Sequence, residues 1–240
     1  MKRVCVIGNS HTACLKLAWD DLQFRLPNIA LTFFADRASG VAAMEPTNGG
    51  LIPVSDRVRK AISHTSGGHG VIDLRKYDSI LVVGLTSGYP KFGYYSNAAA
   101  RQAMLDHIPT TPAFTLVKKV RQTSEIPIFL VHQPLRKKGE DGYDDGGLPT
   151  YRQENGGVGA YRQIIGAINQ ELFQDMNAKL LEQPAQTITD CFYTRSEFGV
   201  DAVRLDLGGG NIKQEDDRAH MNARFGNIFL STHLRAIAFQ

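Results

Sequence analysis

Short apolar runs alternate along this chain with longer segments of helical character, and this alternation limits the folds open to it. The runs of strand length cover residues 2–7, 29–34, 77–83, 126–131 and 187–192. The segments with apolar residues at helical spacing cover residues 13–24, 97–108, 112–123, 158–181 and 222–238. Strands that alternate with helices form a parallel sheet covered by helices on both faces. The sequence therefore predicts an α/β fold, a three-layer α/β/α sandwich with a central parallel sheet.

Two connections between these elements are unusually long. Residues 35–76 are rich in Gly, Pro, Ser and Asn, and residues 133–157 contain six glycines among alternating charges. Long loops of compact domains are commonly binding loops, lids or disordered segments. We expect both to shape a substrate site, with surface disorder as the alternative for the second. Neither has the pattern of a linker, so we expect one domain over residues 1–240, a length that can bury a full core.

The composition argues against several classes of partner. The net charge is only +3, and no dense run of Lys and Arg offers a nucleic-acid footprint. No apolar stretch approaches the length that a bilayer requires, and the N-terminus lacks the features of a signal peptide. The three cysteines form no Cys-x-x-Cys pair, as is typical of a reducing compartment. We therefore expect a cytoplasmic protein that acts without nucleic acid, membrane or cofactor.

Two short segments at opposite ends of the chain hold the groups of nucleophilic catalysis. Residues 8–11 read Gly-Asn-Ser-His and place Ser10 where the first strand turns toward a helix. Residues 217–220 read Asp-Arg-Ala-His, so that Asp217 and His220 lie three residues apart and can point the same way. A hydroxyl, a base and an acid that orients the base are the groups that ester chemistry requires. The alternative for each segment is a local role, as a tight turn or a helix cap.

The two segments resemble the end motifs of the SGNH hydrolases, also called GDSL-like esterases. The first motif of that family is Gly-Asp-Ser after strand one, often followed by His in members that act on sugar polymers, and here Asn9 replaces the Asp. The last motif is Asp-x-x-His before the final helix. The resemblance implies a flavodoxin-like sandwich in which Ser10 is the nucleophile and His220 is the base that takes its proton. It also implies that Asp217 orients His220.

The same resemblance implies an oxyanion hole with three donors. They are the Ser10 N–H, a glycine N–H after strand two, for which Gly40 is the candidate, and an asparagine side chain in a Gly-x-Asn motif after strand three. Here the third motif reads Gly-Leu-Thr and ends at Thr86, whose hydroxyl is a shorter donor. Losing one donor costs about a hundredfold in rate. Either Thr86 substitutes, or another donor such as Asn48 or Asn97 reaches the site, or the enzyme is slow or inactive.

Four further residues are candidates for substrate binding. They are His11, Gly84, His132 and Tyr89. Tyr89 opens a group of aromatic residues after the third strand, and aromatic rings there can stack on a sugar. Packing under a loop is the competing interpretation of that group, and a structural hydrogen bond is the competing interpretation of His132. His64 and His69 lack the neighbouring ligands of a metal site, and no metal is expected.

The function predicted from these residues is serine ester hydrolysis through an acyl-enzyme. The expected substrate is a small-molecule or glycan ester with a small acyl group, and the resemblance favours a carbohydrate O-acetyl ester. Three alternatives stay open. An O-acyltransferase would use the same triad, with an alcohol in place of water. A hydrolase-like module that binds a glycan or a protein would explain Asn9 and Thr86 by weak catalysis. A nucleotide-binding protein of the same fold class is the third alternative. The chain lacks the Gly-x-x-x-x-Gly-Lys motif that cradles phosphates, which argues against it.

Overall fold

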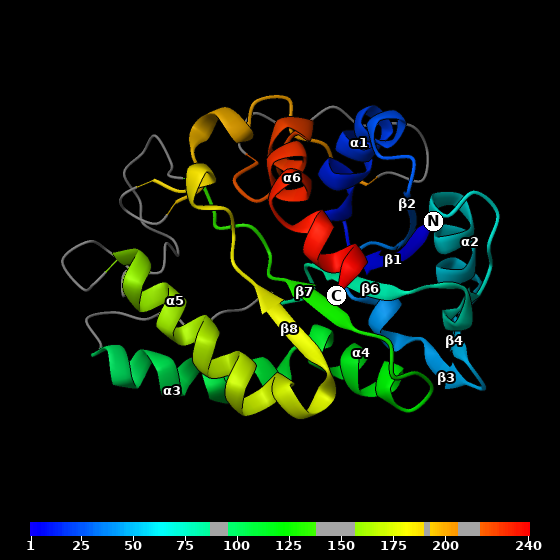
Figure 1. Ribbon diagram of the computed structural model, residues 1–240, viewed down its shortest axis with the longest axis horizontal. Helices are drawn as coiled ribbons and strands as arrows, with labels where there is room; N and C mark the ends of the chain where they lie inside the picture. The colour runs from blue at the N-terminus through cyan, green and yellow to red at the C-terminus, as the bar shows by residue number, and fades with distance from the viewer. Residues whose placement is uncertain (87–95, 138–156, 190–192, 206–216) are drawn as a thin grey trace.

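The centre of the molecule is a parallel β-sheet. The computed structural model describes residues 1–86, 96–137, 157–189, 193–205 and 217–240, and within these ranges the main sheet has five strands (Figure 1). In chain order they are β1 (Lys2–Gly8), β2 (Ile29–Ala35), β6 (Ser79–Val83), β7 (Ile128–Val131) and β8 (Ala178–Leu181). All neighbours pair in parallel, in the order β2-β1-β6-β7-β8. Counted without three short strands outside this sheet, the order is the flavodoxin-like 2-1-3-4-5, which reverses between β1 and β6.

Helices cover both faces of this sheet, as the alternation in the sequence predicts (Figure 1). On one face lie α1 (Thr12–Leu22) and α6 (Ala223–Phe239). On the other lie α2 (Asp56–Thr65), α3 (Asn97–His107), α4 (Pro112–Arg121) and α5 (Gly157–Ile168). Successive strand residues point to opposite faces, so Val4 packs with α1 and α6 while Cys5 packs on the other side. The predicted three-layer α/β/α sandwich is confirmed.

The strands are apolar along most of their length because neither face of the sheet meets water. Residues 4–7 of β1 and residues 80–82 of β6 have no exposed surface. Such continuous apolar runs are typical of parallel sheets that are covered on two sides. None of the helices in the described ranges combines the length and the apolar character that crossing a bilayer takes.

The fifth strand of the sheet is not the predicted one. The sequence predicts a helix over residues 158–181, but α5 ends at Ile168 and β8 takes the last four positions of that range. Asn177 lies directly before β8 and has a left-handed conformation with φ of 43°, which reverses the chain. The Asn169 side chain then bonds both the N–H and the carbonyl of Leu180, at 2.6 and 3.0 Å, and so holds β8 beside the end of α5.

The strand predicted over residues 187–192 is wrong for its described part. Thr187 ends a short 3-10 turn (Ala185–Thr187), and Ile188 makes one isolated bridge to Thr194. Residues 190–192 lie outside the described residues. The physical reason is that β8, which comes earlier in the chain, takes the place beside β7 that the sequence assigns to this segment.

The long connection between β2 and β6 carries structure that its composition hides. It contains α2 and a small antiparallel sheet of β3 (Glu45–Thr47), β4 (Gly50–Ile52) and β5 (Ile72–Asp73). Helix α2 begins after Ser55, whose side chain accepts the Val58 N–H at 3.3 Å. Val58, Ala61 and Ile62 follow at helical spacing and are buried. The Gly, Pro and Ser content of the segment therefore marks turns between short elements.

The two ends of the chain meet where α6 packs against α1. Gly226 of α6 allows this close approach, because a Cβ atom at that position would lie 2.1 Å from the Cys14 carbonyl oxygen. That distance is far inside van der Waals contact, so any side chain would push the helices apart. Ser10 lies just before α1, and residues 217–220 lie just before α6. The helix contact therefore sets the spacing between the two end segments.

Replacing Gly226 by alanine is expected to destabilise the protein by about 1–3 kcal/mol, the range typical of overpacking. The matched control is Gly166→Ala in α5, where a Cβ atom would meet nothing within 4 Å. Alanine there is expected to leave the free energy of unfolding unchanged or to raise it by up to about 1 kcal/mol, because alanine is the better helix former. Urea unfolding measures both variants, and equal stability of the two would contradict the close helix contact.

Candidate active site

Ser10 lies on the turn between β1 and α1, at the carboxyl edge of the sheet. Asn9 fixes this turn: its Oδ1 accepts the His11 N–H at 3.1 Å, and its carbonyl accepts the Thr12 N–H at 3.0 Å. The Thr12 hydroxyl donates to the same carbonyl at 2.8 Å. In open parallel sheets, ligands bind at the carboxyl edge where the strand order reverses, which here is between β1 and β6. The turn therefore presents Ser10 at the place where such folds bind ligands.

Gly84, predicted to bind substrate, packs against this serine turn. Its φ of +69° is a left-handed conformation, and a Cβ atom would lie 2.4 Å from Asn9 Oδ1. Only glycine satisfies both constraints. Its N–H donates to the Val131 carbonyl at 2.9 Å. Gly84 thus supports the turn that carries Ser10, and substrate contact at this position stays a prediction.

The other half of the site, residues 217–222, is bonded to a neighbouring segment of the chain. The Val203 N–H donates to the Met221 carbonyl at 3.3 Å, and the Asn222 N–H donates to the Phe198 carbonyl at 2.8 Å. Backbone bonds of this kind tie a loop to a fixed partner. The segment before α6 is therefore held in place from the side as well as by the helix that follows it.

The structure brings Ser10, His220 and Asp217 into one line of hydrogen bonds. Ser10 Oγ lies 2.7 Å from His220 Nε2, and His220 Nδ1 lies 2.8 Å from Asp217 Oδ2. A carboxylate only accepts hydrogen bonds, so Nδ1 carries the proton and Nε2 accepts the serine hydroxyl. This is the tautomer that a general base needs. Two groups that lie 210 residues apart in the sequence therefore meet in the fold.

The Asp217 carboxylate is held by donors on both oxygens. Its Oδ1 accepts the N–H groups of Ala219 and His220, each at 3.0 Å, and its Oδ2 accepts the Arg204 Nε–H at 2.6 Å. Burial works to raise the pKa of Asp217, but the hydrogen bonds from Arg204 and from the two backbone groups outweigh it. They hold the pKa well below its usual range. Asp217 is therefore ionised near neutral pH, although its side chain is only 3% exposed.

The pKa of His220 lies below its ordinary value. Burial is the main cause, because it disfavours the charged ring. The Asp217 carboxylate raises the pKa, and the positive charges of Arg204 and Lys137 lower it again. The ring is therefore neutral at pH 7, and its Nε2 lone pair is available for the serine proton.

His11, predicted to bind substrate, stacks on the ring of His220. The ring centroids lie 4.8 Å apart, and the ring planes are 16° from parallel. Burial and the charge of His220 lower the pKa of His11 to about 3, although Asp217 works to raise it. Its Nδ1 has no hydrogen-bond partner in the part of the chain that the structure describes. His11 is thus a neutral ring that fixes the plane of His220, and its contact with substrate stays a prediction.

The predicted oxyanion donors come from three segments at the carboxyl edge. Within the described ranges the Ser10 N–H has no acceptor. Thr86 is buried after β6, and its Oγ1 accepts the Gln133 N–H at 2.9 Å, which leaves its own hydrogen available to donate. The Gly40 N–H, after β2, donates to the Arg37 carbonyl at 3.5 Å. The oxyanion roles of these residues stay predictions.

His132 uses both ring nitrogens within the protein. Its Nδ1 lies 2.6 Å from the Gln133 carbonyl and so donates, and its Nε2 lies 2.6 Å from the Tyr161 hydroxyl and accepts its hydrogen. The Tyr161 oxygen in turn accepts the Gln183 N–H at 2.8 Å. The structural interpretation of His132 accounts for these contacts, and a role in substrate binding stays a prediction. Tyr89, the other candidate, lies outside the described residues.

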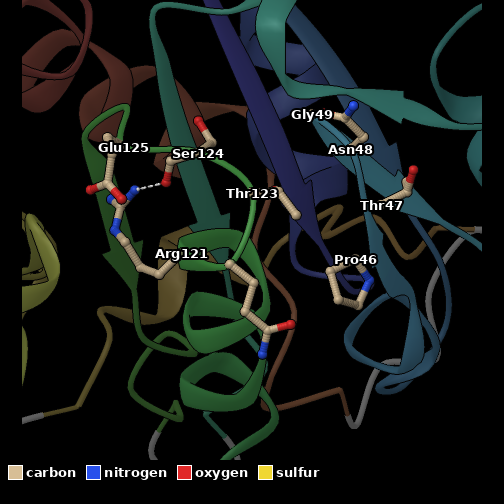
Figure 2. Close-up of a pocket in the computed structure, with 9 residues that line it drawn as sticks. Pro46, Thr47, Asn48, Gly49, Arg121, Thr123, Ser124 and Glu125 are labelled. Atoms are coloured by element: carbon tan, nitrogen blue, oxygen red, sulfur yellow. Dashed lines mark hydrogen bonds between the residues drawn. The ribbon is translucent and has the colours of Figure 1, made fainter.

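Asn48, considered as a replacement oxyanion donor, lies at the opposite edge of the sheet. It is in the turn between β3 and β4 and lines a cavity of about 580 Å³ together with the loop between α4 and β7 (Figure 2). That loop leads into the amino end of β7, whereas Ser10 follows the carboxyl end of β1. The Asn48 alternative is therefore wrong. Asn97, the second alternative, is exposed at the first position of α3.

Two charged residues near Asp217 and His220 have no signal in the sequence. Arg204 bonds Asp217, and Lys137 contributes positive charge at His220. Neither belongs to a motif, and they come from separate segments that only the fold brings together. By contrast, a contact of His11 with the site could be expected from its position next to Ser10.

Comparison with known proteins finds likeness at the level of fold. No protein-family model and no curated protein matches the chain. A solved periplasmic domain of a lipopolysaccharide acetyltransferase from Salmonella ser. Paratyphi A is 10% identical, with a TM-score of 0.49, over 99% of this chain and 84% of that chain. A carbohydrate acetylesterase family member from Sinorhizobium meliloti is 13% identical, with a TM-score of 0.44, over 100% of both chains. A lipase/acylhydrolase from Enterococcus faecalis is 11% identical, with a TM-score of 0.44, over 99% of this chain and 96% of that chain.

The buried ring of His11 is expected to make the protein lose stability as the pH falls. Its pKa is about 3 in the folded protein and 6.5 ordinarily, so the unfolded state binds a proton first and stability declines below about pH 6.5. At about pH 4.5 this group alone costs about 2–3 kcal/mol. His11→Phe keeps a ring on His220 and removes the titration. Urea unfolding at about pH 7 and 4.5 is expected to show a smaller drop for the variant, and an equal drop would contradict the buried neutral ring.

Proposed function

We propose that this protein is a serine ester hydrolase of the SGNH type that works through an acyl-enzyme. The observation that carries the proposal is the unbroken line of hydrogen bonds from Ser10 through His220 to Asp217, 2.7 and 2.8 Å long. A serine hydroxyl is a weak nucleophile and becomes a strong one only beside an oriented base. The low pKa values of His220 and Asp217 support the proposal, because they leave the base unprotonated and the acid ionised at pH 7.

In the proposed reaction His220 takes up a proton and gives it back twice, once in each half of the reaction. Ser10 Oγ attacks the ester carbonyl while His220 Nε2 takes its proton, and the Asp217 carboxylate stabilises the charged ring. His220 then gives the proton to the departing alcohol, and the acyl group stays on Ser10. Water attacks next: His220 takes a proton from it and returns that proton to Ser10 as the acyl–oxygen bond breaks. The products are the alcohol, the carboxylic acid and the free enzyme.

The negative charge that develops on the carbonyl oxygen needs donors beside Ser10. We propose the Ser10 N–H and the Thr86 hydroxyl, because neither hydrogen is donated to an acceptor within the described ranges. Gly40 is proposed as the third donor. Its present bond to the Arg37 carbonyl is 3.5 Å long, at the weak end of hydrogen-bond distances, so releasing it for the oxyanion costs little.

The proposed substrate carries a small acyl group, and its proposed natural form is a carbohydrate O-acetyl ester. Two features of the sequence support a sugar: His11 follows Ser10 directly, and a group of aromatic residues that begins at Tyr89 follows β6. That group lies outside the described residues. A single domain over residues 1–240 and a cytoplasmic location belong to the same proposal.

Treatment with a fluorophosphonate probe is expected to add one label to the wild-type protein and none to Ser10→Ala, because only an activated serine reacts. The matched control is Ser231→Ala, which removes a hydroxyl from the exposed face of α6. It is expected to label like the wild type. Intact-mass analysis counts the labels, and a wild-type protein that folds but takes no label would sink the proposed function.

Hydrolysis of 4-nitrophenyl acetate is expected to fall on the acid side with a midpoint below pH 6.5. The sign follows from the base: His220 must be neutral to take the serine proton, and its pKa in the folded protein lies below the ordinary 6.5. The measurement is kcat/KM as a function of pH. A midpoint above 6.5 would contradict the assignment of His220, and acyl transfer to an added alcohol in preference to water would indicate the acyltransferase alternative.

A further inference from the structure

Arg204 reaches the triad from an anchored backbone. The segment that carries Arg204 follows Asp201, a turn residue with a left-handed φ of 53°. The neighbouring Val203 is bonded through its N–H to the Met221 carbonyl, directly after His220. The main chain of Arg204 is therefore fixed beside the two residues that its side chain approaches.

The contact between Arg204 and Asp217 is directional as well as ionic. The Arg204 Nε donates at 2.6 Å to Asp217 Oδ2, which is the oxygen that also accepts the His220 Nδ1–H. The other oxygen, Oδ1, is already held by two backbone N–H groups. Arg204 therefore holds Oδ2, the oxygen that faces His220. The backbone N–H groups of the loop hold only Oδ1. Hydrogen bonds between charged groups are among the strong ones in proteins.

We propose that Arg204 is a positioning residue that keeps Asp217 Oδ2 on the His220 Nδ1–H and places a fixed positive charge behind the pair. The proposal rests on the serine hydrolase function proposed above. Its first effect is orientation, because a carboxylate bonded at three points cannot rotate away from the ring. Its second effect is electrostatic, because a guanidinium near His220 opposes protonation of the ring and keeps the base free at lower pH.

The other charges that face His220 set the size of this effect. Lys137 supplies a second positive charge from a different segment, and Asp217 opposes both cations. His11 covers one face of the ring and is neutral near pH 7. Because Lys137 remains when Arg204 is replaced, we expect part of the lowering of the His220 pKa to remain. The acid-side midpoint of the pH profile is therefore expected to shift only in part. The Arg204 side chain is also 46% exposed, so water weakens its charge.

The test compares three variants of the full chain with the wild type. Arg204→Gln can still donate a hydrogen bond but carries no charge, and Arg204→Lys keeps the charge. Arg25→Gln removes the same charge from an exposed position after α1. That position lies at the amino edge of the sheet, far from the triad. The measurement is the rate constant of fluorophosphonate labelling from about pH 4.5 to about pH 8, followed by intact mass, with the thermal midpoint of each variant.

For Arg204→Gln we expect labelling at pH 7 to slow by about tenfold and the acid-side midpoint to rise by about one pH unit. Arg204→Lys is expected to keep the wild-type midpoint while labelling more slowly, and Arg25→Gln is expected to match the wild type in both. An Arg204→Gln midpoint equal to that of the wild type overturns the inference even if the rate falls, because a merely structural residue changes the rate alone.

Two further outcomes keep the inference separate from the function on which it rests. A folded wild-type protein that takes no label overturns the proposed function, whatever the variants do. If Arg204→Gln fails to fold, Arg204→Met carries the same expectation, since its flexible apolar chain fills a similar space without charge. A midpoint for that variant equal to the wild-type value overturns the inference in the same way.

Discussion

The packing of α6 on α1 is the contact on which the candidate site depends. Ser10 belongs to the sheet through β1, whereas Asp217 and His220 belong to a segment that only precedes α6. The two halves are brought within a hydrogen bond of each other because the helices touch where Gly226 leaves no side chain. Backbone bonds from residues 198 and 203 then hold the segment laterally. A close apolar contact on one face of the sheet thus determines distances between polar atoms at its edge.

Opposing charges set the protonation state of the line formed by Ser10, His220 and Asp217. An aspartate alone would raise the pKa of its histidine, and here it is opposed by burial and by two cations, Arg204 and Lys137. The stacked ring of His11 adds a neutral cover in place of water. The result is a buried base that stays unprotonated at pH 7 beside an acid that stays ionised. Both conditions follow from residues outside the two end motifs as much as from the motifs themselves.

The sequence predicts the layers, and it singles out the three residues that the fold joins by hydrogen bonds, because both depend on local patterns. Apolar runs identify β1, β2, β6 and β7, and two short motifs identify Ser10, Asp217 and His220. It fails at β8 because that strand has four residues and continues the apolar spacing of α5, so nothing local separates them except Asn177. It misses Arg204 and Lys137 for a different reason. Their importance lies in where separate loops meet, and a single sequence does not carry that information.

The two oxygens of Asp217 have different partners, and the main chain decides which is which. Oδ1 faces two backbone N–H groups that cannot turn, so only an oxygen is tolerated there. An asparagine of the same shape would therefore direct its NH₂ group at the Nδ1–H of His220 and at the Arg204 guanidinium, three donors without an acceptor. The ring could avoid this conflict only by carrying its proton on Nε2, and Nε2 could then no longer accept the hydrogen of the Ser10 hydroxyl. The direction of two backbone N–H groups in one short loop thus selects the tautomer of the His220 ring.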